Sequence, residues 1–343
     1  MPDLIMHVGL HKTGTTTIQQ QVLAGLPNFL GKERYHDPPQ TLSGTHEEDK
    51  MLHSVVKDFL WLSSKELQRR TDEWVSHVQK LASRNIPEQP LLISNEIFTE
   101  WRGDTVEPWL YSPTPNKKRK RKKPMPLARF LGDYLIPAWG DGQVKVVITL
   151  RNQPEWLASL YAQQSDKIRY ASQKDFEQQV ANLISAEDPF LDWDSMVEEI
   201  CSAVGRENVC VLLHEDMHQP AFWEDLISFM EIEDSACRPE INNTRLNVRK
   251  SSSNQWELMR PATPTQRRLK YKWPKFLFPL TRSIVLSGLR KFEPVMRQFI
   301  FANRRGDSIE LNEEIVEKIR NYVKPFNARL SQRLNRDLTD LGY

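Results

Sequence analysis

The chain has 343 residues, of which 39% are hydrophobic and 9% aromatic, and its 47 basic and 45 acidic side chains give a net charge of +2. This composition supplies enough apolar surface for a folded core and excludes a largely disordered chain. The three cysteines, Cys201, Cys210 and Cys237, are too few and too irregularly spaced for a disulfide framework or a cysteine metal site.

Four short apolar runs predict buried strands. They are Leu4–Leu10, Pro90–Ile93 with an extension to Phe98, Val144–Leu150 and Val209–Leu213, with a shorter candidate at Phe29–Lys32. Runs without polar alternation are typical of parallel strands covered on both faces. Helical patterns lie between and after them, at Thr15–Leu26, Val55–Arg84, Asn152–Lys167, Asp175–Ala186, Met196–Val204, Ala221–Met230 and within Asn312–Leu334. This alternation predicts an α/β fold, with a doubly wound and mostly parallel sheet flanked by helices.

The first strand breaks into a loop of lysine, glycine and hydroxyl residues, His11-Lys12-Thr13-Gly14-Thr15-Thr16-Thr17. Glycine lets the backbone turn tightly, N–H groups at the start of the next helix attract an anion, and lysine adds a full charge. The loop is not a Walker A motif, because Lys12 precedes Gly14 instead of following it. The alternative is a helix start capped by threonine hydroxyls and without a ligand.

Ser94-Asn95-Glu96 follows the second long strand. Ligands bind beyond the carboxyl ends of strands in an open parallel sheet, so we expect Glu96 near Lys12. A carboxylate there suits a general base, and the alternative is an acid that only stabilises a helix dipole. His11 is the second candidate base, with a structural loop residue as its alternative.

Arg151 ends the strand Val144–Leu150, and Asn152 and Pro154 are typical of the start of a helix. Ser159 lies about one and a half turns into that helix, so it can face the same cavity as Arg151. A guanidinium with a hydroxyl suits a terminal phosphate. The alternative is a capped helix in which Ser159 is merely buried and Arg151 pairs with an acid.

These motifs resemble those of sulfotransferases that use 3′-phosphoadenosine 5′-phosphosulfate (PAPS). Lys12-Thr13-Gly14-Thr15-Thr16 is similar to the phosphosulfate-binding loop K-[ST]-G-T-[ST], and Arg151 to Tyr161 resembles the signature R-[ND]-P-x-x-x-x-x-S-x-Y, with Gln153 inserted. The runs Leu212–Met217 and Tyr322–Tyr343 are more weakly similar to later family patterns. Within the first of these, we expect Glu215 and Asp216 to cap the following helix.

The resemblance implies one sulfotransferase domain over residues 1–343, with a sheet like that of P-loop nucleotide-binding proteins, acting as a PAPS-dependent O-sulfotransferase that releases 3′-phosphoadenosine 5′-phosphate. The residues matched to the phosphosulfate loop would hold the 5′-phosphosulfate: Lys12, Thr13, Gly14, Thr15, Thr16 and Thr17. Lys12 would also stabilise charge on the leaving phosphate oxygen. Arg151 and Ser159 would hold the 3′-phosphate and select PAPS over ATP. Carbohydrate sulfotransferases resembling this chain place a catalytic glutamate at the position of Glu96.

No metal is expected, because the histidines and acids lack ligand spacing. Two other functions stay open. A P-loop kinase is disfavoured by the position of Lys12 and by the lack of an evident Mg²⁺-binding acid. A non-catalytic sulfotransferase-like module for membranes or polyanions is disfavoured by the presence of Lys12, Glu96, Arg151 and Ser159.

Two basic segments interrupt the pattern. Residues 112–126 are predicted to form a flexible loop with seven consecutive basic residues, Lys117–Lys123. This run suits a polyanionic acceptor, a nuclear-localisation or nucleic-acid patch, or a solvated loop. Residues 260–305 mix basic and aromatic side chains and are predicted to form a helical insertion or lid. Such a mixture suits an anionic membrane surface, or packing onto the main domain.

We therefore expect a hydroxyl acceptor on a carbohydrate or glycolipid, peripheral contact with an anionic membrane, and no nucleic-acid partner. The first residues lack a secretory signal pattern, and no apolar run approaches the roughly 20 residues of a membrane span. The expected location is the cytoplasm, with some of the protein at the membrane surface. The acceptor's identity, the position sulfated and the oligomeric state stay open.

Overall fold

The computed structural model describes residues 2–23, 26, 28–30, 63–85, 89–94, 126–140, 143–165, 168, 171–187, 189–232, 250–252, 254–259 and 308–343. Glu96, the basic run Lys117–Lys123 and the predicted insertion 260–305 lie outside the described residues. None of the helices within these ranges is long and apolar enough to cross a membrane.

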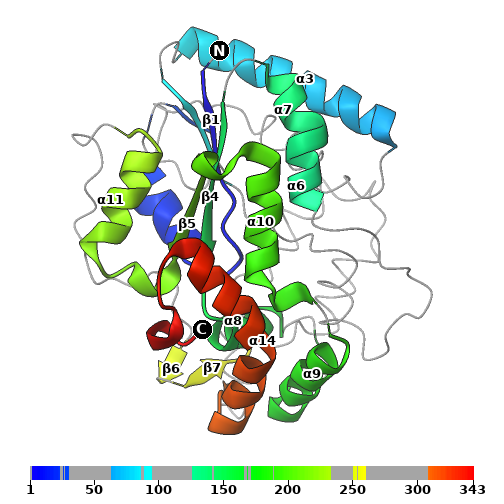
Figure 1. Ribbon diagram of the computed structural model, residues 1–343, viewed down its shortest axis with the longest axis vertical. Helices are drawn as coiled ribbons and strands as arrows, with labels where there is room; N and C mark the ends of the chain where they lie inside the picture. Colours follow the sequence, from blue (N-terminus) through cyan, green and yellow to red (C-terminus); the bar gives the residue numbers. More distant parts are fainter. Residues whose placement is uncertain are drawn as a thin grey trace, which may run out of the picture.

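A five-stranded parallel sheet forms the centre of the fold (Figure 1). Its strands are β1 (Leu4–His7), β2 (Phe29–Leu30), β3 (Leu91–Ser94), β4 (Val144–Leu150) and β5 (Val209–Leu213), in the spatial order β2-β3-β1-β4-β5. All four pairings are parallel, and they place His7 opposite both Ser94 and Val147. The carboxyl ends of β1, β3 and β4 therefore lie side by side.

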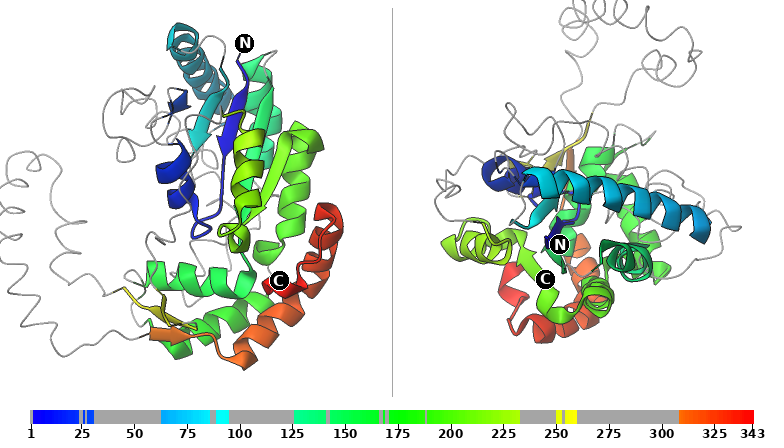
Figure 2. Two further views of the ribbon diagram at one scale, coloured as in Figure 1. Left: turned by 90° about the vertical axis from the view of Figure 1, so that its left-hand side faces the viewer. Right: turned by 90° about the horizontal axis from the view of Figure 1, so that it is seen from above.

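Helices cover both faces of the sheet, which confirms the doubly wound α/β fold. Alternate residues of β1 enter two different cores, Leu4 and Met6 on one face and Ile5 on the other. The face of Ile5 is covered by α1 (Thr15–Ile18), the π-helix Gln19–Leu23 and α11 (Pro220–Phe229). The opposite face is covered by α3 (Ser64–Asn85), α10 (Trp193–Val204) and the consecutive helical segments α6 (Pro126–Phe130), Leu131–Leu135 and α7 (Ile136–Trp139). Figure 2 shows α1 and α10 on opposite sides of the sheet.

Three further helices lie at the end of the molecule away from the N-terminus (Figure 1). They are α8 (Gln153–Gln164), α9 (Gln173–Ser185) and α14 (Glu313–Leu334). A small antiparallel sheet of β6 (Lys250–Ser252), β7 (Gln255–Glu257) and β8 (Ser308–Glu310) contacts α8 and α9. Glu257 of β7 pairs with Ser308 of β8, so the chain leaves this sheet before residue 260 and returns to it in the adjacent strand.

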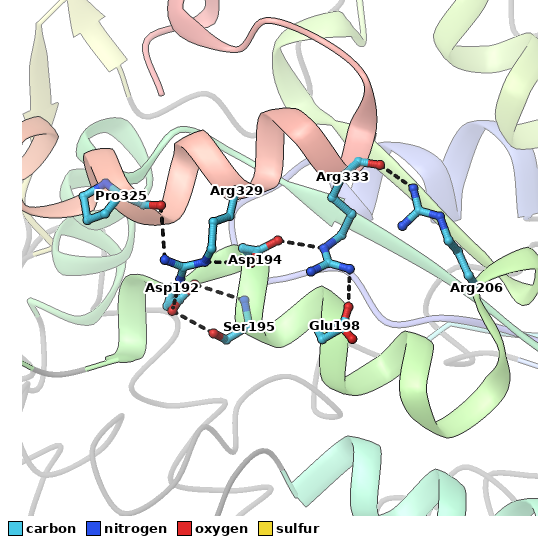
Figure 3. Close-up of polar contacts among 8 residues, drawn as sticks. All are labelled: Asp192, Asp194, Ser195, Glu198, Arg206, Pro325, Arg329 and Arg333. Carbon is cyan, nitrogen blue, oxygen red and sulfur yellow. Dashed lines mark hydrogen bonds and ion pairs between the residues drawn. The ribbon is translucent and has the colours of Figure 1, made fainter.

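Ion pairs fasten α14 to α10 (Figure 3). The carboxylate of Asp194, which is 5% exposed, accepts from Arg329 Nε at 3.0 Å and from Arg333 Nε at 2.7 Å. Arg329 also binds Asp192, whose Oδ1 accepts from the Ser195 N–H at 3.0 Å and so caps α10. Arg333 pairs in addition with Glu198. Asp192 and Asp194 are nearly buried, so we expect their pairs to contribute more than the pair of the exposed Glu198.

The predicted strand β1 is too long. Strand pairing on both sides ends at His7, although Val8 and Leu10 still donate backbone hydrogen bonds to Val147 and Thr149 of β4, at 2.9 and 3.3 Å. The first helix also differs from the prediction, because it changes to π geometry at Gln19 and Leu26 is not helical. The helical stretch 126–139 and the three-stranded sheet were not predicted.

Candidate active site

The loop between β1 and α1 turns through two left-handed backbone positions, Lys12 (φ 67°) and Gly14 (φ 86°). Glycine adopts such a conformation without strain, and a Cβ at Gly14 would lie 2.3 Å from the sulfur of Met217. Gly14 itself is the N-cap of α1, with no side-chain cap. The start of α1 is therefore not capped by a threonine hydroxyl, which the alternative interpretation required.

The threonines of this loop face different ways. Thr13 is fully buried, and both its hydroxyl and its N–H donate to the carbonyl of Leu10, at 2.6 and 3.3 Å. Thr15 is also buried, whereas Lys12, Gly14, Thr16 and Thr17 are partly exposed. Thr13 thus supports the loop from inside, and the partly exposed residues form its outer side.

Arg151 reaches from the end of β4 to this loop. Its Nη1 donates to the carbonyl of Lys12 at 3.3 Å, and its Nη2 pairs with Glu155 in the first turn of α8. Its Nε is buried and has no hydrogen-bond partner among the described residues. The structure thus joins the two predicted motifs at one edge of the sheet. It also shows the acid pairing that the alternative interpretation required.

Two tryptophans hold the backbones of the two motifs. Trp156 Nε1 donates to the carbonyl of His11 at 2.7 Å, and Trp193 Nε1 donates to the carbonyl of Arg151 at 3.0 Å. Their rings pack edge to face with centroids 4.9 Å apart. Neither tryptophan was predicted as a site residue, and only the position of Trp156 within the second signature pointed to this region.

The predicted start of α8 is confirmed. Asn152 is its N-cap, with Oδ1 accepting from the N–H of Glu155 at 3.0 Å, and Pro154 lies in the first turn. Ser159 lies further along the helix and is 8% exposed. Its hydroxyl is therefore nearly enclosed by the protein.

Glu215 and Asp216 do not cap the following helix, so that prediction is wrong. The N-cap of α11 is Gln219, without a side-chain cap. Glu215 instead accepts from the backbone N–H and the side-chain amide of Asn152, at 2.9 and 3.0 Å, while Asp216 is bound by both terminal nitrogens of Arg336. Burial raises the pKa of Glu215, and the Asn152 N–H opposes that rise.

A buried polar cluster lies beneath the first loop, on the α1 face of the sheet. His7 Nδ1 is 2.8 Å from the hydroxyl of Ser94, and His7 Nε2 is 3.2 Å from that of Thr149. Gln19, in the π-helical turn, donates to Ser94 at 2.8 Å. These contacts link β1, β3 and β4 directly below the loop. They also fix Ser94, from which the chain continues toward Glu96. Glu96 itself lies outside the described residues.

No group of three or more metal-ligating side chains gathers within the described ranges. The other candidate base, His11, is partly exposed. Its backbone carbonyl is the one held by Trp156.

Comparison with known proteins assigns the chain to a family. Residues 2–271 match the model of the sulfotransferase domain. A sulfotransferase from Alicyclobacillus acidocaldarius is similar in structure, with 12% identity, full coverage of both chains and a TM-score of 0.48. The sulfotransferase domain from the curacin biosynthetic pathway has 10% identity over 74% of this chain and 81% of its own, with a TM-score of 0.37. No curated protein matches the sequence. The sequence match covers most of the chain, which therefore belongs to the sulfotransferase domain family and is a PAPS-dependent sulfotransferase.

Proposed function

We propose that PAPS binds at the edge of the sheet where the Lys12 loop meets Arg151, and that the sulfuryl group is transferred there to a hydroxyl of a carbohydrate or glycolipid. The observation that carries this proposal is the contact between Arg151 Nη1 and the Lys12 carbonyl, together with the buried, unpartnered Nε of the same guanidinium. An N–H enclosed without a partner is costly in a protein. A bound phosphate oxygen would satisfy it.

The first loop suits the 5′-phosphosulfate. Its outer side holds Lys12, Gly14, Thr16 and Thr17 at the start of a helical segment, where backbone N–H groups and the helix dipole favour an anion. Lys12 would place its charge beside the leaving phosphate oxygen, which gains negative charge during transfer. The buried Thr13 and Thr15 would hold the loop in shape.

The second motif suits the 3′-phosphate. Arg151 supplies a planar cation whose N–H groups match phosphate oxygens, and Ser159 adds a hydroxyl from α8. No metal takes part in this proposal, since transfer between two oxygens depends here on positioning and charge.

The acceptor hydroxyl requires a base, and we assign Glu96, with His11 as the second candidate. For Glu96 the support is its place after Ser94, which ends the strand beside β1. The basic run Lys117–Lys123 and the segment 260–305 support an anionic acceptor or membrane surface by charge alone. We place the enzyme in the cytoplasm, with part of it at the membrane surface.

The test is calorimetry with 3′-phosphoadenosine 5′-phosphate, 5′-AMP and ATP. The wild type is expected to bind the 3′-phosphorylated nucleotide at least about tenfold more tightly than 5′-AMP, and Arg151→Ala is expected to abolish that preference. Equal binding of the three nucleotides would overturn the assignment of the site. An acceptor screen with carbohydrates and glycolipids, and flotation with anionic vesicles, then test the other parts.

A further inference from the structure

A chain of hydrogen bonds joins Tyr343 to the start of α8. The Tyr343 hydroxyl donates to Glu215 Oε2 at 3.1 Å, and the backbone N–H and side-chain amide of Asn152 both donate to Glu215 Oε1. The Asn152 amide also reaches the carbonyl of Leu341 at 3.4 Å. One carboxylate thus accepts three hydrogen bonds from two parts of the chain that are far apart in sequence.

The segment after α14 is fixed to the β5–α11 connection at two neighbouring points. Arg336 holds Asp216 with both terminal nitrogens, and Tyr343 holds the adjacent Glu215. Between them, Gly342 has a φ of 85°, and a Cβ there would lie 3.7 Å from the Asn152 amide. The segment therefore packs directly against Asn152.

Asn152 connects this network to Arg151. It is the next residue in the chain, and it caps the helix whose Glu155 pairs with the Arg151 guanidinium. Glu215 lies close enough to Arg151 for the guanidinium charge to lower its pKa against the effect of burial. Its oxygens nevertheless bind Asn152 and Tyr343, so the Arg151 Nε keeps no partner within the described structure.

We propose that Glu215 and Tyr343 are positioning residues for Arg151 in the recognition of the 3′-phosphate. The inference rests on the proposed function of Arg151 and extends it to two residues without direct contact with the donor. Glu215 holds Asn152 by its backbone N–H and its amide, and Tyr343 holds Glu215. Loss of either contact lets the end of β4 turn away, so the affinity that depends on the 3′-phosphate falls.

The measured quantity is the ratio of the dissociation constants of 5′-AMP and 3′-phosphoadenosine 5′-phosphate, determined by calorimetry on the full chain. Glu215→Ala is expected to lower this ratio about tenfold, and Tyr343→Phe about threefold, because it removes only the outer hydrogen bond. Glu215→Gln keeps an oxygen for Asn152 and is expected to restore most of the ratio. Thermal melts of each variant confirm folding, and Tyr343→Phe tests the proposal should Glu215→Ala not fold.

Tyr161→Phe is the matched control. The wild-type Tyr161 hydroxyl donates to Asp175 at 2.7 Å, so this substitution also removes a hydrogen bond from a tyrosine to a carboxylate, at the other end of α8. It is expected to leave the ratio unchanged. A wild type without preference for the 3′-phosphate would overturn the proposed function and this inference together. A wild-type ratio that survives Glu215→Ala, or that falls equally in Tyr161→Phe, would overturn the inference alone.

Discussion

The indole of Trp156 donates a hydrogen bond to the backbone of the first loop, so its replacement by phenylalanine tests how that loop is held. The change keeps an aromatic ring against Trp193 and Phe190, whose centroids lie 4.9 and 5.1 Å away. It removes the N–H that donates to the His11 carbonyl at 2.7 Å. The perturbation is therefore one hydrogen bond and part of a ring, at a side chain that is 3% exposed.

The expected cost has two parts. Losing the hydrogen bond costs about 1 kcal/mol net, and the smaller ring leaves unfilled volume that costs about 1–2 kcal/mol more. The free energy of unfolding is expected to fall by about 2–3 kcal/mol. The loop that carries Lys12 also loses its tie to α8, so binding of 3′-phosphoadenosine 5′-phosphate is expected to weaken about fivefold, or about 1 kcal/mol.

Trp139→Phe is the matched control. Trp139 is fully buried and its indole donates to the carbonyl of Pro2 at 3.1 Å, next to the amino end of β1. The chemical change is the same, but it lies at the opposite edge of the sheet from the Lys12 loop. Urea unfolding should show a similar loss of stability for both variants, with unchanged m-values, and calorimetry should show weaker nucleotide binding for Trp156→Phe alone.

Two results would refute this reasoning. Trp156→Phe that loses stability but binds the nucleotide as tightly as the wild type would show that the loop keeps its shape without the indole. Equal loss of binding in Trp139→Phe would show that affinity follows overall stability and not the local tie.

Three other perturbations have defined outcomes. Asp194→Asn removes the charge that Arg329 and Arg333 share. It is expected to lower the free energy of unfolding in urea by about 2 kcal/mol, which is less than the loss of a fully enclosed ion pair because Arg329 is 47% exposed. An unchanged unfolding midpoint would contradict the importance of this cluster. For Glu215, burial raises the pKa in the folded state above the usual 4.5. Its favourable contribution to the free energy of unfolding is therefore complete below pH 4.5 and is lost as the pH rises through the pKa of the folded state. The stability of the wild type relative to Glu215→Gln should therefore decrease above pH 4.5, by up to about 1.4 kcal/mol per pH unit, and an increase would contradict the assignment. Replacing residues 260–307 with a short glycine-serine loop should preserve the melting temperature and nucleotide binding, because β7 and β8 pair on either side of the cut; an unfolded product would show that the core depends on the segment.

The sequence predicted the sheet well where a run of apolar residues is also a run of paired residues. Both ends of β4 and β5 agree with prediction. β1 was predicted too long because Val8 and Leu10 are apolar and buried, yet they bond only to the β4 side. An apolar pattern predicts burial, and burial of this segment continues beyond His7, where strand pairing on both sides of β1 ends.

Within the candidate site, Lys12 and Arg151 could be predicted because each stands in a local motif. The residues that hold these motifs were missed, because each acts through a contact distant in sequence. Trp156 and His11 are 145 positions apart, and Tyr343 and Glu215 are 128 apart. Glu215 was interpreted as a helix cap because an acid before a helix usually stabilises its first turn. The N-cap of this helix is Gln219, four residues after Glu215, and the Glu215 carboxylate binds Asn152 instead.

The two acids near Arg151, Glu155 and Glu215, bind different partners, and this arrangement suits an enzyme that binds and releases an anion. Glu155 neutralises the guanidinium through one terminal nitrogen, which lets a cation that is only 11% exposed persist without a nucleotide. Glu215 binds the backbone beside it and leaves the guanidinium its unpartnered Nε. Had both carboxylates bound the guanidinium, a 3′-phosphate would compete with two fixed charges. In the proposed donor site, Glu215 is held by Asn152 and Tyr343, so an arriving 3′-phosphate would meet a guanidinium that is paired with one carboxylate and still has an unpartnered Nε.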